Sequence, residues 1–167
     1  AYFLSPHARV IVLEQEEQPA YHSSGRSAAM YIEGYENPVV SELTKLGAEF
    51  FFTPPQGFTE HSLVNRCGGL TAAGPGETKA LKQYLATWRS HCPELIHIGP
   101  QEARDIVPIL RDDWLSGAAW DPSWHSIDVH ELLSGYIRGL RANGAVLKNK
   151  ATVTGLAQRA NSWVIKA

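Results

Sequence analysis

The acid Glu14 stands directly after a short apolar run, Val10 to Leu13, that is rich in β-branched residues. Such a run predicts a strand that is buried on both faces of a parallel sheet. In nucleotide-binding α/β folds, ligands lie outside the carboxyl ends of the strands, where a carboxylate can accept hydrogen bonds from both hydroxyls of a ribose. Glu14 is therefore a candidate ribose ligand.

The run from His22 to Ala29, His-Ser-Ser-Gly-Arg-Ser-Ala-Ala, is a second candidate binding segment. Its small residues allow close approach to backbone N–H groups, its serines add hydroxyl donors, and Arg26 adds a fixed positive charge. A pyrophosphate or an anionic flavin ring would use such groups. In the alternative interpretation, Arg26 and His22 only order a loop.

The serines of this run, Ser23, Ser24 and Ser27, have a second interpretation as caps of a helix that begins near Arg26. A helix N-terminus with serine hydroxyls is itself a site for anions. The two interpretations therefore do not exclude each other.

Alternating helices and strands must position these candidates. Apolar residues at helical spacing predict helices over 39–52, 77–91, 100–107 and 128–142. Short apolar runs predict strands over 10–13, 63–67, 95–98, 115–120, 145–148, 151–156 and 162–167, and the strand at 63–67 loosens at Gly68-Gly69. The clearest helix begins at Asp128, because Glu131 completes a capping-box pattern with it.

A strand that ends in Glu14, followed after a short polar connection by His-Ser-Ser-Gly-Arg-Ser-Ala-Ala, resembles the FAD-dependent oxidoreductases of the D-amino-acid oxidase, glycine oxidase and sarcosine oxidase superfamily. The resemblance implies an α/β fold, a partial Rossmann-like FAD-binding domain with the first part of a substrate domain, which is α+β. It places residues 1–56 and 125–167 in the FAD-binding domain and residues 57–124 in the substrate lobe.

The resemblance also implies how FAD is held. Glu14 would bind the adenosine ribose, and Val153 would touch the adenine through its backbone. The segment from Gly25 to Ala28 would run past the pyrophosphate and the flavin. The implied cofactor-binding residues are Glu14, Gln15, Ser24, Gly25, Arg26, Ser27, Ala28 and Val153. No catalytic residue is assigned, and the Gly-x-Gly-x-x-Gly turn of the family does not occur in this sequence.

The activity implied by the resemblance is oxidation of the C–N bond of an amino acid or related amine, with hydride transfer to the flavin. The flavin supplies that chemistry, and the protein binds, orients and tunes it. A second hypothesis is oxidation of a hydroxy acid or a polyol phosphate. A third is a folded, non-catalytic module that does not retain flavin.

The composition narrows the classes of protein to which the chain can belong. With 44% hydrophobic residues, 19% charged residues and a net charge of -2, the chain is an ordinary globular protein. Scattered basic residues argue against a nucleic-acid partner, and no apolar run reaches the ~20 residues of a membrane span. We expect a small-molecule partner, no metal site and a cytoplasmic protein whose Cys67 and Cys92 are free buried thiols. The oligomeric state stays open.

Both ends of the sequence lack a boundary signal. The opening Ala-Tyr-Phe-Leu-Ser-Pro resembles the last turn of an apolar helix stopped by proline, and the strand at 162–167 has no cap or turn after it. We therefore expect a piece of a longer polypeptide. Because the glycine turn supplies the main backbone donors to a pyrophosphate, we expect this chain alone to bind FAD weakly or not at all.

Overall fold

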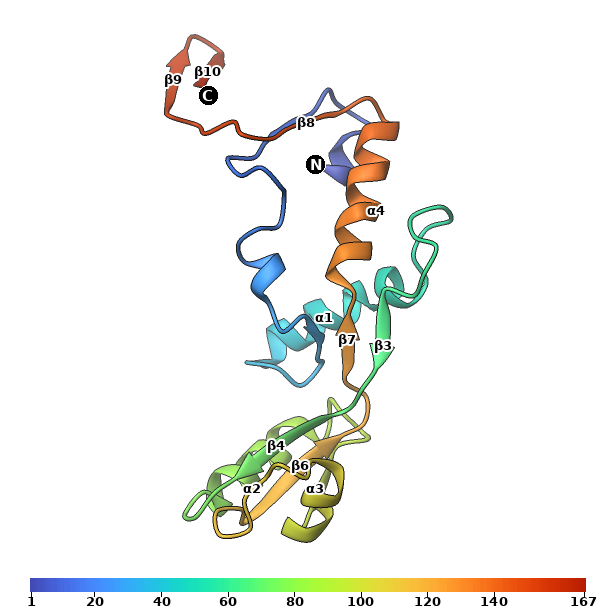
Figure 1. Cartoon of the computed structure of the whole chain (residues 1–167), viewed down its shortest axis with the longest axis vertical. Coiled ribbons are helices and arrows are strands. Elements are labelled where there is room, and N and C mark those ends of the chain that lie inside the picture. Colours follow the sequence, from blue (N-terminus) through green and yellow to red (C-terminus); the bar gives the residue numbers. More distant parts are fainter. The chain divides into compact units, whose positions relative to one another are not determined.

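The structure is a computed structural model that describes all 167 residues (Figure 1). The chain forms two compact units. Unit 1 comprises residues 1–29, 54–63 and 128–167, and unit 2 comprises residues 30–53 and 64–127. The domain boundaries predicted from the sequence refer to the complete family fold and stay a prediction.

Unit 1 is built around a pair of parallel strands. Its elements are η1 (Tyr2–Leu4), β1 (Ile11–Leu13), η2 (Ser24–Arg26), α4 (Val129–Ala142), β8 (Val146–Lys148), β9 (Gly155–Arg159) and β10 (Ser162–Lys166). Strands β1 and β8 pair in parallel, with Ile11 beside Val146 and Leu13 beside Lys148. The sheet has these two strands only. The predicted strand at 10–13 is confirmed, but its predicted burial on both faces is wrong, because Ile11 is 68% exposed.

Helix α4 begins and ends where the sequence predicts. The Asp128 carboxylate accepts a hydrogen bond from the Glu131 backbone N–H at 2.9 Å, which satisfies one of the free donors of the first turn. Gly144, with φ of +77°, follows the C-cap Asn143. Two glycines let aromatic rings approach the helix closely, since a Cβ on Gly135 would lie 2.5 Å from the Phe58 ring and one on Gly139 would lie 2.2 Å from the Tyr2 ring.

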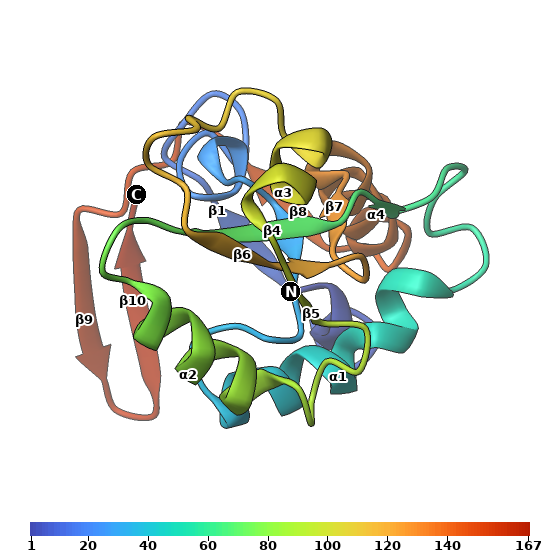
Figure 2. The same cartoon turned by 90° about the horizontal axis from the view of Figure 1, so that it is seen from below.

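The segment after β8 differs from the prediction. Residues 151–154 form no strand, because their backbone groups bind separate partners: the Ala151 N–H donates to Glu14 and the Thr154 N–H donates to Lys166. The strand predicted at 151–156 is therefore wrong over 151–154, and only its last two residues lie in a strand, at the start of β9. Strands β9 and β10 follow as an antiparallel hairpin near the C-terminus (Figure 2), which confirms the strand predicted at 162–167.

Unit 2 contains two antiparallel sheets and three helices. Its elements are β2 (Met30–Tyr31), α1 (Pro38–Phe52), β3 (Val64–Arg66), β4 (Gly69–Ala73), α2 (Thr78–Trp88), β5 (Ile96–Ile98), α3 (Pro100–Ile106), β6 (Gly117–Asp121) and β7 (His125–Ile127). The strand orders are β2-β7-β3 and β4-β6-β5. The mixed α/β class predicted from the sequence is confirmed, although strands β2 and β7 were not predicted.

The core of unit 2 lies on both faces of the sheet β4-β6-β5. Leu81, Leu85 and Trp88 of α2 form one buried cluster with Ala119 of β6. Ala103 of α3 forms another with Ala118. Because neighbouring residues of a strand point to opposite faces, α2 and α3 cover opposite faces of this sheet. The apolar face predicted for α2 is confirmed.

Three further expectations need correction. The predicted helix near Arg26 is a single 3-10 turn, η2, in which no serine side chain caps the N-terminus. The predicted apolar face of α1 is largely exposed, with Leu43 at 63% and Leu46 at 81%. Both cysteines are free, but only Cys92 is buried, and Cys67 is exposed.

None of the helices combines the length and the hydropathy that crossing a bilayer requires.

Candidate functional site

Glu14 is held at the carboxyl end of the parallel pair. Its N–H donates to the Lys148 carbonyl at 2.9 Å, and its carbonyl accepts from the Ala151 N–H at 2.8 Å. One carboxylate oxygen, Oε1, accepts from the Glu16 N–H at 3.0 Å. The backbone of Glu14 is thus fixed by β8 and the segment after it, while Oε2 is left as a free acceptor in a half-buried side chain.

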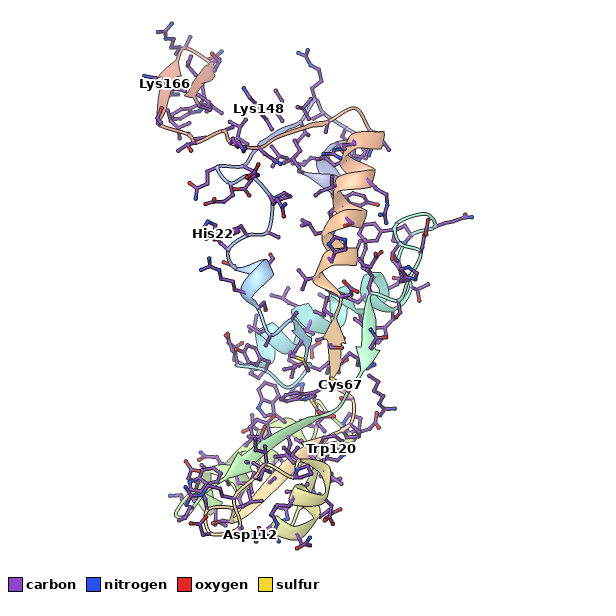
Figure 3. The ribbon with its side chains drawn as sticks, in the orientation of Figure 1. His22, Cys67, Asp112, Trp120, Lys148 and Lys166 are labelled. Carbon is purple, nitrogen blue, oxygen red and sulfur yellow. The ribbon has the colours of Figure 1, made fainter.

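The loop that follows is tied together by Glu16. Its Oε1 accepts from the Gln15 side-chain amide at 3.2 Å and lies 2.8 Å from His22 Nε2. Figure 3 labels His22 in this segment. These contacts connect the two candidate segments, which the sequence placed in separate motifs. The sequence alone did not single out Glu16. It stands close to Glu14 and Glu17, and nothing in its spacing distinguishes it from a solvated surface acid.

The segment after His22 requires a glycine. The Gly25 N–H donates to the Ala20 carbonyl at 2.8 Å, and a Cβ on Gly25 would lie 2.3 Å from that oxygen. Ala20 adopts a left-handed φ of 65°. This closed turn, followed by η2, replaces the helix start that the serines suggested.

Three exposed side chains on this turn present donors that have no acceptor. The hydroxyls of Ser23 and Ser24 make no hydrogen bond, and the Arg26 guanidinium has no carboxylate partner. Arg26 instead lies over the ring of Tyr21, 5.0 Å from its centroid. This donor set, two hydroxyls and a cation, fits a phosphate or another anion. Tyr21 was also missed, since no spacing rule links an aromatic residue to a later arginine in a loop.

The other predicted residues contribute less. Ser27 uses its hydroxyl to accept from the Ala29 N–H at 3.0 Å, and Ala28 adds only a small exposed side chain. Val153 is 45% exposed and lies outside any strand. Its backbone N–H and carbonyl make no hydrogen bond within the chain. They are therefore free to hydrogen-bond to the polar edge of a ligand ring.

An apolar cavity of about 350 Å³ opens beside Glu14 in unit 1. Glu14 is the only carboxylate in its wall, which consists of Ala1, Tyr2, Phe3, Val12, Glu14, Pro19, Leu133, Tyr136, Ile137, Leu140 and Leu147. Burial and the neighbouring Tyr2 phenol raise the pKa of Tyr136, so this phenol stays neutral. The cavity therefore offers packing surface and no acid or base besides Glu14.

The sequence matches one protein family over its whole length. The family is DAO, described as FAD dependent oxidoreductase, and the match covers residues 1–167.

The fold is shared with several solved structures. Glycine oxidase from Geobacillus kaustophilus superposes with a TM-score of 0.80 at 17% identity, covering 98% of this chain and 46% of that one. L-α-glycerophosphate oxidase from Mycoplasma pneumoniae, with FAD bound, gives 0.79 at 15% identity, covering 98% and 44%. L-proline dehydrogenase from P. horikoshii gives 0.75 at 19% identity, covering 97% and 43%. At such identities the likeness shows the fold, and the chain spans less than half the length of these proteins.

Proposed function

Because this chain belongs to the DAO family of FAD-dependent oxidoreductases, we propose that it forms part of the FAD site of an enzyme that oxidises the C–N bond of an amino acid or related amine. One observation carries the proposal: Glu14 stands at the carboxyl end of a parallel strand pair and is joined through Glu16 to a turn with unpaired donors. That is the place and the chemistry expected for a dinucleotide.

In this proposal each group has a defined role toward the cofactor. The free carboxylate oxygen of Glu14 accepts hydrogen bonds from the ribose. Ser24 and Arg26, with the backbone of Gly25, serve the pyrophosphate or the flavin ring, and the free backbone groups of Val153 serve the adenine. Ser27 and Ala28 line the same segment, and Gln15 supports the loop through Glu16. FAD, when bound, supplies the hydride acceptor.

The choice of an amine substrate is supported by the names of the structural neighbours. Glycine oxidase, L-proline dehydrogenase and iminodiacetate oxidase are among them. The second candidate, oxidation of a hydroxy acid or polyol phosphate, is favoured by the glycerophosphate oxidase. The free cysteines support a cytoplasmic location.

An anaerobic substrate screen on the complete gene product separates the two candidates. We expect amino acids or secondary amines to remove the visible flavin absorbance on mixing. We expect 2-hydroxy acids and glycerol phosphate to leave it unchanged. Bleaching by the hydroxy compounds alone would replace the first candidate with the second. Absence of bound flavin in the complete product would favour the non-catalytic module.

The role of Glu14 is tested by Glu14→Ala in the complete gene product. Loss of charge-assisted hydrogen bonds to the ribose should weaken FAD binding by about 1–3 kcal/mol in a flavin titration. Glu17→Ala is the matched control, because Glu17 is an exposed acid of the same loop that pairs only with Lys150. Equal FAD affinity of the two variants would show that Glu14 is not the ribose ligand.

A further inference from the structure

We propose that unit 2 carries a second ligand site, a groove between α2 and β5 that binds a phosphate-class anion attached to a small apolar group. The groove has a volume of about 350 Å³ and is lined by Lys82, Leu85, Ala86, Arg89 and His97. We call it the basic groove. Its residues belong to unit 2, whereas those assigned to FAD belong to unit 1, and the proposal does not depend on flavin binding.

The helix places two cations along one stripe of its surface. Lys82 and Arg89 are separated by two helical turns, and Ala86 lies between them at the spacing that keeps residues on the same side of a helix. Leu85 is 8% exposed and belongs to the core cluster under the helix. The stripe therefore has a cation at each end and an apolar floor between them.

The third polar group comes from the strand. His97 of β5 pairs with Ala119 of β6, and Ala119 belongs to the core cluster that α2 covers. Directly paired residues share a face of the sheet, so His97 lies on the α2 side. Its Nε2 lies 3.2 Å from the place where a Cβ on Gly117 would stand. Gly117 therefore leaves the room in which the imidazole sits beside the helix.

None of the three polar groups is neutralised within the chain. Lys82, Arg89 and His97 form no ion pair, and the lining of the groove contains no carboxylate. Three arginines of unit 2 are paired, Arg66 with Glu94, Arg104 with Asp112 and Arg111 with Asp113, whereas Lys79 of α2 lies outside the groove and forms no ion pair. Cations gathered in a concave surface without counter-charge raise its potential and attract anions.

The chemistry of the lining indicates the ligand class. The guanidinium of Arg89 can form two parallel hydrogen bonds to a phosphate or carboxylate, while Lys82 acts as a compact point charge. Leu85 and Ala86 offer an apolar surface next to these cations. A small phosphorylated molecule with an apolar part matches this combination better than a bare inorganic ion.

The test is an NMR titration of the 167-residue chain with phenyl phosphate, which joins a phosphate to an apolar ring, at constant ionic strength balanced with sodium chloride. We expect saturable shifts of the amide signals of α2 and β5, read separately from any shifts of the turn around Arg26 in unit 1. The double variant Lys82→Gln/Arg89→Gln should weaken binding at least tenfold. Lys79→Gln, which removes an exposed cation of α2 outside the groove, should leave the binding curve unchanged.

A second variant tests the groove without removing its cations. Ala86→Glu places a carboxylate in the groove and keeps all three polar groups, so it should abolish binding while the amide spectrum stays folded. Shifts that rise linearly without saturation, or that Lys79→Gln reduces as much as the double variant, would overturn the proposal.

Discussion

At the scale of single residues, backbone geometry and burial decide what each candidate can do. Gly25 is needed because a side chain there would meet the Ala20 carbonyl at 2.3 Å. Glu14 keeps one carboxylate oxygen free because the other is held by the Glu16 N–H. The same kind of argument separates the two cysteines, which have opposite environments.

Cys67 should react with a thiol reagent at about pH 8 while Cys92 stays protected, since thiolates are the reactive form. Burial first, and then the charges of Asp121 and Glu33, raise the pKa of the Cys92 thiol to about 11. Cys92 is 3% exposed. Iodoacetamide labelling followed by mass spectrometry should find one modified cysteine in the folded protein and two in denaturant.

Cys67→Ser is the control and should show no labelling before unfolding.

The contribution of Cys92 to folding stability depends on pH with a definite sign. Because the pKa of Cys92 is raised in the folded state, its protonated thiol stabilises the fold fully below the ordinary thiol pKa of about 8.5, and this contribution is lost as pH rises toward 11. Labelling of both cysteines at pH 8 without denaturant would contradict the buried environment.

At the scale of elements, local signals fix where helices start and stop, and packing decides which faces are covered. Asp128 caps α4 as predicted, but the other half of the predicted capping box is absent, because the Glu131 carboxylate accepts from Thr59 and the Asp128 N–H donates to the Leu63 carbonyl. Helix α2 buries its predicted face. Helix α1 begins at its Asn37 cap, whose side chain accepts from the Val39 and Val40 N–H groups, yet it leaves Leu43 and Leu46 exposed. Helix formation and helix burial are thus separate outcomes.

Gly135→Ala should destabilise unit 1 although alanine is the better helix former. Helix propensity favours alanine by about 1 kcal/mol, but a Cβ on Gly135 would lie 2.5 Å from the Phe58 ring and 2.7 Å from the Phe58 carbonyl oxygen. Overpacking of this kind costs about 1–3 kcal/mol. Urea unfolding followed by circular dichroism should show a lower midpoint.

Gly47→Ala provides the matched comparison within helix α1. Its added Cβ would have only an ordinary contact, 3.9 Å from the Phe51 ring, so propensity should prevail and raise stability by up to about 1 kcal/mol. If both substitutions changed the midpoint in the same direction, the close packing of Phe58 on α4 would be in doubt.

At the scale of the whole molecule, the chain divides into two compact units that each carry a different candidate site. Unit 1 holds Glu14 and the turn around Arg26, and unit 2 holds the basic groove. The parallel sheet of unit 1 has two strands, and a cavity of about 350 Å³ lies next to it. Parallel sheets are usually buried on both faces, whereas this pair leaves Ile11 exposed and borders a cavity.

We therefore expect the 167-residue chain to show no saturable FAD binding up to about 100 μM, which corresponds to a binding free energy weaker than about -5.5 kcal/mol. The physical reason is that the Gly-x-Gly-x-x-Gly turn, whose backbone N–H groups bind the pyrophosphate, does not occur in the sequence. Quenching of FAD fluorescence provides the measurement. A purified chain that carries stoichiometric yellow flavin would contradict this expectation.

Features that depend on neighbouring residues could be predicted from the sequence. Helical spacing, caps and turn residues located the four helices, and an apolar run placed Glu14 at the end of a strand. The residues that carry the resemblance, Glu14 and the run around Arg26, were enough to predict the family that the comparison shows.

Features that join distant residues are known only from the folded structure. It placed Ala151 on the carbonyl of Glu14 instead of in a strand, left β1 half exposed, and brought His97 beside Lys82 and Arg89. Such contacts depend on topology and on the entropy of closing the loops between their partners. A periodic pattern carries no information about them.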